Sequence, residues 1–143
     1  ILSFSTGAKL PDNAVITKIT LRLARKAITG GGNPIATFQG FMVDVKKGLI
    51  GTAALQAADF QTPVAPTVAI AAVTPVGNVY SLNLIKAKAA INLLASNGGL
   101  TQIRLRFKLD DNNNKVANFI SFFSANTTTA ANRPQLIIEY YVP

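Results

Sequence analysis

The residues of this chain best suited to hold an ion form the run Asp110-Asp111-Asn112-Asn113-Asn114. Calcium takes about six to eight oxygen ligands, which carboxylates, side-chain amides and backbone carbonyls supply. Asp110, Asp111 and Asn113 are therefore candidate calcium ligands. The run lacks the spacing of an EF-hand loop, and Asp and Asn are also preferred in tight turns because they tolerate positive φ. A plain turn and a calcium-stabilised turn both fit this segment, and no other cofactor is expected.

A row of basic side chains lies just before this run. Arg104, Arg106 and Lys108 alternate with apolar residues, which is the pattern of a β-strand with one wet face. We predict that this basic face is exposed, and that Lys18 and Arg22 extend it if their strand is a neighbour. Such a stripe would attract an acidic polymer such as a polysaccharide. The simpler interpretation is a solvated strand face whose charges also discourage aggregation.

Sugar binding would also call for exposed aromatic rings. The chain has eight Phe, three Tyr and no Trp, and most of the Phe residues fall at positions predicted to be buried. Tyr80, Tyr140 and Tyr141 are therefore the amphipathic candidates. We include Tyr80 with the basic row as a candidate ligand-binding residue, although each tyrosine equally fits ordinary packing in the core or at an edge.

No set of residues in the chain is typical of an enzyme. His and Cys are absent, which leaves only six carboxylates for acid–base work. Asp44 and Glu139 alternate with apolar residues and are predicted to lie on solvated strand faces, where nothing brings them together as a glycosidase pair. The run Gly30-Gly31-Gly32 lacks the Gly-Lys-Ser/Thr ending of a phosphate-binding loop. We therefore predict a non-catalytic protein.

Composition limits the possible partners. The 143 residues fit one domain, residues 1–143, with 49% hydrophobic and only 14% charged residues. The net charge is +8, but the basic residues are dispersed and lack interleaved aromatics, so nucleic-acid binding is not expected. The longest apolar run, Val68 to Val73, is far shorter than the roughly 20 residues of a membrane-spanning helix. Because the chain begins at Ile1, we expect a mature or excised product.

Alternating apolar and polar residues indicate short strands through most of the sequence. The strands are expected at residues 1–6, 14–27, 36–46, 62–74 (an edge strand, because of its prolines), 79–84, and three times within 101–143. A single helical turn is expected within residues 52–60. One short helix is predicted where Ala87, Ala90, Ile91 and Leu94 recur at helical spacing. This pattern predicts an all-β fold, an antiparallel β-sandwich of jelly-roll-like form with one short helix.

The strand pattern also predicts which side chains form the core. The rows expected to point inward are Ile19, Leu21 and Leu23; Phe41, Val43 and Val45; Tyr80, Leu82 and Leu84; and Ile103, Leu105, Phe107 and Leu109.

Three stretches resemble a known family. Leu10 to Leu23, LPDNAVITKITLRL, resembles the "LP-x-x-A-x-I-x-x-A-x-L-x-L" opening of the DNRLRE-type domain. Phe122-Phe123-Ser124-Ala125, followed by Arg133 to Tyr140, is similar to the closing "F-x-S … RP-x-L-x-V-x-Y" of that family. Thr101 to Asn114 is similar to surface-protein sequences of filamentous Chloroflexi type. The resemblance implies an extracellular, non-catalytic β-sandwich module, often part of surface architecture and sometimes associated with polysaccharide.

Two departures from that family shape the expected function. The Trp common in the middle of such domains is replaced by Val79-Tyr80, and the strand usually found upstream of Leu2-Ser3-Phe4 has almost no counterpart. A sandwich without that strand would have an unpaired edge and an apolar groove that a neighbouring chain can fill. We expect a secreted, self-associating subunit of a surface layer or filament; the alternative is a carbohydrate-binding module for acidic polysaccharide.

Overall fold

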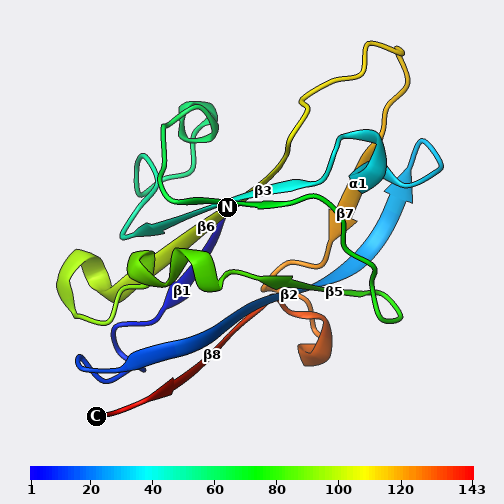
Figure 1. Cartoon of the computed structure of the whole chain (residues 1–143). Helices are drawn as coiled ribbons and strands as arrows, with labels where there is room; N and C mark the ends of the chain where they lie inside the picture. The colour runs from blue at the N-terminus through cyan, green and yellow to red at the C-terminus, as the bar shows by residue number, and fades with distance from the viewer.

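Eight strands form two antiparallel sheets that pack face to face in the computed structural model, which describes all residues 1–143 (Figure 1). The strands are β1 (Leu2–Ser5), β2 (Val15–Thr29), β3 (Phe41–Lys47), β4 (Thr67–Ile70), β5 (Val79–Asn83), β6 (Leu100–Phe107), β7 (Phe119–Phe122) and β8 (Gln135–Tyr141). The helical segments are short: α1 (Pro34–Thr37) and the 3₁₀ turns η1 (Ala57–Phe60), η2 (Ile85–Ala90), η3 (Ser96–Gly99) and η4 (Ala130–Asn132).

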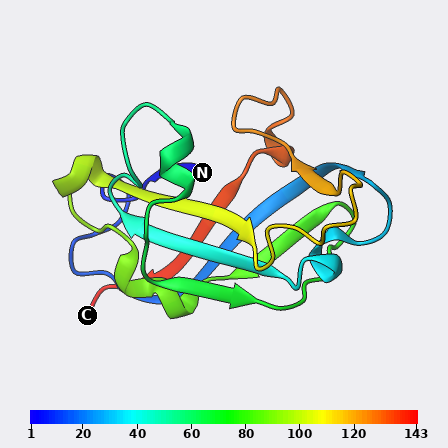
Figure 2. The ribbon, with the colours of Figure 1, turned by 90° about the horizontal axis from the view of Figure 1, so that it is seen from above.

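One sheet has the strand order β1-β6-β3-β4, and the other is built around the long strand β2. β5 pairs with one side of β2, whereas β8 and then β7 pair with successive parts of its other side. The chain crosses between the two layers after β1, β2, β4, β5 and β6, and Figure 2 shows the strands of one layer lying across those of the other. The predicted all-β antiparallel sandwich is confirmed, including β4 as an edge strand.

The core lies between the two layers and contains the predicted inward rows except Leu109, which lies beyond the end of β6 and outside the core cluster. Sixteen buried residues form one cluster, which includes the predicted residues of β2, β3 and β5 together with Ile103 of β6. Leu105 and Phe107 are partly buried and pack against this cluster. Alternation along a strand therefore identified the inner face of each sheet correctly.

Two predictions of local secondary structure were wrong. The helix expected near Ala87 to Leu94 is a pair of 3₁₀ turns with a kink at Ala87, and the backbone is already extended at Ile91. Ala87, Ala90 and Ile91 are still buried, because packing onto the core matters more here than helical hydrogen bonding, whereas Leu94 is 48% exposed. The strand expected from residue 36 starts only at Phe41, since Asn33 caps α1 and Pro34 occupies its first turn. No helix of this structure is long and apolar enough to cross a membrane.

Candidate functional site

The two sheets are open to solvent along one side, between β1 and β8. β1 pairs only with β6, and β8 pairs only with β2, so the outer edge of each strand has free backbone groups. Two cavities lie along this open side. One is lined by the start of β1, by β7 and by Pro134, and the other by the end of β1 and by Leu136 and Ile138 of β8. We call this region the β1–β8 groove.

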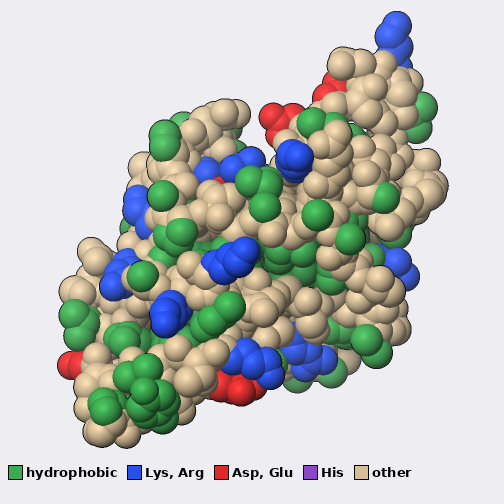
Figure 3. Space-filling model, in the orientation of Figure 1, with side chains coloured by type: hydrophobic (Ala, Val, Ile, Leu, Met, Phe, Trp, Pro, Cys, Tyr) green, Lys and Arg blue, Asp and Glu red, His purple; other side chains and the backbone are tan.

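The first cavity of the β1–β8 groove is strongly apolar. It has a volume of about 270 Å³, and nine of its eleven lining residues are hydrophobic. Its floor is aromatic: the Phe41 ring stacks on Phe107 at a centroid distance of 5.4 Å, and Phe122 lies 6.3 Å from Phe41. Figure 3 shows the opposite side of the molecule, where β4, β5 and η2 lie toward the viewer and hydrophobic side chains also reach the surface. The second cavity, of about 210 Å³, includes Phe4 and Leu10.

The groove has the two features that an added β-strand requires. Free N–H and C=O groups on an edge strand pair with an incoming backbone, and apolar cavities receive its alternate side chains. Tyr140 of β8 is 41% exposed and lies on the same face as Leu136 and Ile138, whereas Ile137 and Tyr141, 41% and 54% exposed, lie on the opposite face of this edge strand. The predicted edge and groove are thus present in the structure, and Tyr140 and Tyr141 lie on this edge strand.

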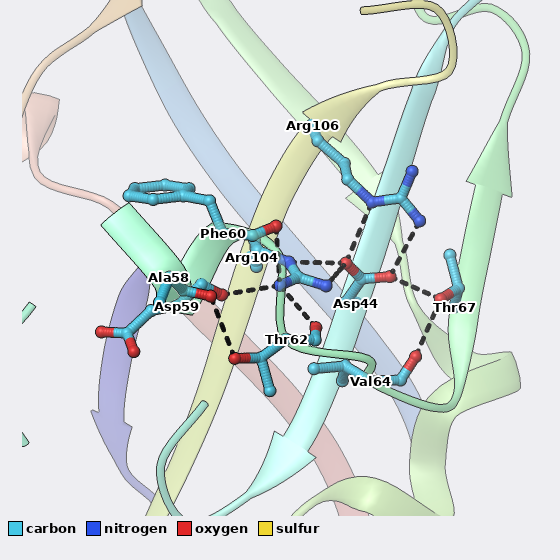
Figure 4. Close-up of polar contacts among 9 residues, drawn as sticks. All are labelled: Asp44, Ala58, Asp59, Phe60, Thr62, Val64, Thr67, Arg104 and Arg106. Carbon is cyan, nitrogen blue, oxygen red and sulfur yellow. Dashed lines mark hydrogen bonds and ion pairs between the residues drawn. The ribbon is translucent and has the colours of Figure 1, made fainter. Parts of the chain in front are cut away.

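The opposite face of the β1-β6-β3-β4 sheet contains a buried ion cluster, shown in Figure 4. Asp44 of β3 is fully buried, and its Oδ2 atom lies 2.8 Å from both Nε and Nη2 of Arg104 on β6. Arg106 donates from Nε to the same oxygen at 3.1 Å, and the Thr67 hydroxyl donates to Oδ1. The prediction that Asp44 lies on a solvated face was wrong, because this face is covered by residues 52–66.

Arg104 is buried for the same reason, and its predicted exposure was wrong. Only 4% of the residue is accessible, and Nη1 donates to the carbonyls of Asp59, Phe60 and Thr62 in the covering segment. This segment is held by Asp59, whose carboxylate accepts from the backbone N–H groups of Thr52 and Gln56. Sequence reasoning missed this role of Asp59, although the capping pattern of Gln56 and Asp59 was a visible signal.

Gly51 allows the covering segment to approach closely. Its φ of +74° lies in the left-handed region, and an added Cβ atom would collide with the Asp59 carboxylate. The charged cluster is therefore enclosed by a segment whose own turn depends on glycine.

The pKa of Asp44 follows from this enclosure. Burial alone would raise the pKa of its carboxyl, but hydrogen bonds from Thr67, Arg106 and Arg104, together with the charge of Arg106, lower it below the ordinary value. Asp44 is therefore a structural group that is ionised at neutral pH and is held by three side chains from β4 and β6.

The structure separates the other predicted ligand-binding residues. Arg106 has 41% of its side chain accessible, and Lys108 is exposed just beyond β6. Arg22 lies on β2 in the other sheet, so it does not extend the basic row, and it donates to Gln135 at 2.9 Å. Tyr80 is only 3% exposed and packs against Phe122, which excludes it as a sugar platform.

The predicted calcium segment forms a series of local turns. Asp111 accepts a hydrogen bond from the backbone N–H of Asn113 at 2.8 Å, and Asn114 accepts one from Val116. Asn113 has a φ of +56°, which Asn tolerates better than most residues. No group of three or more acidic, His or Cys side chains converges here or elsewhere, and calcium binding by Asp110, Asp111 and Asn113 stays a prediction.

No protein-family model, no curated protein and no solved structure matches this chain. The β1–β8 groove and the surface above the ion cluster are the two candidate functional regions of the molecule.

Proposed function

We propose that this protein is a non-catalytic structural subunit that assembles with copies of itself by accepting a strand in the β1–β8 groove. The observation that carries the proposal is the pair of free strand edges, one from each sheet, on either side of apolar cavities. An incoming strand would pair with one edge and cover the core from its open side.

The two edges carry little charge that would prevent pairing. Natural edge strands are often protected by charges, prolines, bulges or short length. β1 is four residues long and carries no charge. β8 is seven residues long and follows Pro134, and its one charged residue, Glu139, is paired with Lys18 at 2.7 Å. The low charge of both edges therefore favours association.

Burial of side chains in the groove supplies the driving force. A cavity of about 270 Å³ has room for large apolar side chains, and burying each one stabilises an assembly by about 1.5–3 kcal/mol. The low charged fraction of the chain, 14%, fits a protein whose surface is shared with neighbours. Identical subunits that donate a strand to one neighbour and accept one from another form an open filament or layer when the rotation between neighbours does not close into a ring.

The location of this assembly is inferred from the resemblance to DNRLRE-type domains. That resemblance supports an extracellular or cell-surface role, and strand-mediated assembly is compatible with it. The alternative function is a carbohydrate-binding module. One separate observation favours it, the polar cavity above the ion cluster.

Sedimentation velocity over a concentration series, with negative-stain microscopy, tests the proposal. We expect the native protein to form ordered assemblies as its concentration rises. The variant Ile137→Lys/Tyr141→Lys places two charges on the edge of β8, where both side chains are exposed, and should remain a monomer.

The matched control is Ala36→Lys/Ala89→Lys, which adds the same charge at exposed positions outside the strands. It should assemble like the native protein. A native protein that is monomeric at every concentration, or an edge variant that assembles normally, would refute the proposal.

A further inference from the structure

A second surface of the molecule has the chemistry of a ligand site and is independent of strand pairing. A cavity of about 550 Å³ lies above the ion cluster and is at least twice as large as either cavity in the β1–β8 groove. Its lining is mostly polar and consists of Phe60, Gln61, Thr62, Pro63, Val64, Arg104, Arg106 and Asp110. The covering segment and β6 form its walls.

The guanidinium of Arg106 lines the cavity and is only partly engaged in contacts within the protein. Arg104 already neutralises Asp44 through two contacts of 2.8 Å. Arg106 approaches the same carboxylate less closely, at 3.1 Å from Nε and 3.5 Å from Nη2, and 41% of its side chain is accessible. Two guanidiniums therefore share one buried carboxylate, and Arg106 carries the surplus charge toward the cavity.

The remaining lining groups fit a sugar ring. Phe60 is 49% exposed at the rim and offers an apolar ring face. Gln61 and Asp110 are exposed beside it and provide a donor and acceptors for hydroxyl groups. Asp110 makes no ion pair with either arginine, and solvent at the rim weakens its effect on Arg106.

We propose that this cavity binds a uronic acid unit of an acidic polysaccharide. Arg106 binds the carboxylate, because its planar fork matches two carboxylate oxygens, and Phe60 packs against the sugar ring. Arg104 acts as a positioning residue: it holds Asp44 and the carbonyls of the covering segment, and so fixes the cavity wall. The site thus replaces the predicted stripe of Arg104, Arg106, Lys108 and Arg22, which the structure does not form.

Calorimetric titration with trigalacturonate tests the proposal, with neutral maltotriose as the comparison ligand. Arg106→Gln should weaken trigalacturonate binding about tenfold or more, the usual effect of losing a charge-assisted hydrogen bond. Lys108→Gln removes the same charge two residues away and should change the affinity less than about twofold. Phe60→Ala, at an exposed position, should weaken binding severalfold with no loss of folding.

Two further measurements separate charge from geometry. Arg106→Lys keeps the charge but lacks the planar fork, so it should lose most of the affinity that Arg106→Gln loses. Thermal unfolding of each variant in the absence of ligand verifies that the protein is folded. The proposal is wrong if trigalacturonate binds no better than maltotriose, if Lys108→Gln weakens binding as much as Arg106→Gln, or if a sulfated trisaccharide binds more tightly than trigalacturonate.

Discussion

The two faces of the β1-β6-β3-β4 sheet differ in which side chains the chain covers and which it leaves exposed. On the outer face, the chain covers its own charges: residues 52–66 enclose Asp44 and Arg104, and no buried polar side-chain atom of the molecule lacks a hydrogen-bond partner. On the inner side, the β1–β8 groove leaves apolar side chains and free strand edges uncovered. A stable monomer would be expected to show the reverse. The difference is therefore what we expect if the charged cluster is internal structure and the groove is the contact surface that we propose.

The largest loss of stability should come from removing a charged side chain of the buried ion cluster. Arg104→Ala leaves a buried carboxylate with a single, more distant cation and removes donors from three carbonyls. We expect the free energy of unfolding to fall by about 3–5 kcal/mol. Urea unfolding of this variant in the monomeric Ile137→Lys/Tyr141→Lys background measures it.

Lys108→Ala is the control for this experiment. Its side chain is exposed, and the change should stay within about 0.5 kcal/mol. If both variants unfolded with the same free energy, the ion cluster would not be what fixes the covered face.

The acid dependence of stability should be a smaller effect of the same cluster. Because the pKa of Asp44 is lower in the folded protein than its ordinary value of 3.8, the folded state binds this proton less readily than the unfolded chain. The stability that Asp44 contributes is therefore present above pH 3.8 and is lost as the pH falls through its folded pKa.

The comparison with Asp44→Asn isolates this contribution. Urea unfolding between about pH 6 and pH 2.5 should show a steeper acid decline for the native side chain than for the amide, which does not titrate. Parallel declines for the two proteins would show that other carboxyls are responsible.

The smallest effect is expected on the open side, at the ion pair of β8. Lys18 and Glu139 lie 2.7 Å apart, but both side chains are more than half exposed. Glu139→Gln should lower the free energy of unfolding by less than about 1 kcal/mol, and the difference should shrink at high salt. A loss comparable to that of Arg104→Ala would mean that β8 is held by charge and not by its apolar face.

The sequence predicted the strands and their inner faces better than it predicted their outer faces. Alternation identified Leu21, Val43 and Ile103 as core because strand periodicity is local. The same periodicity placed Arg104 on an outer face but carried no information on whether a distant segment would cover that face. Residues 52–66 do so, and they are separated from β6 by more than thirty positions.

Site residues were predicted less well for a related reason. Arg22 and Arg104 share a strand pattern, yet their strands lie in different sheets, which single-strand reasoning does not determine. The chemistry of Tyr80 fitted both ligand binding and core packing. Its inward position in β5 shows that it belongs to the core. The β1–β8 groove was anticipated from the resemblance to a family with one more strand, not from periodicity.

Amide hydrogen exchange of β1 and β8 tests the groove most directly. The measurement compares dilute monomer with concentrated native protein, using β4, the short edge on the far side of its sheet, as an internal reference. We predict that amides of Leu2–Ser5 or Gln135–Tyr141 become protected in the assembled protein while those of Thr67–Ile70 do not change. Assembly that leaves both β1 and β8 as exchangeable as in the monomer would contradict strand addition at this site.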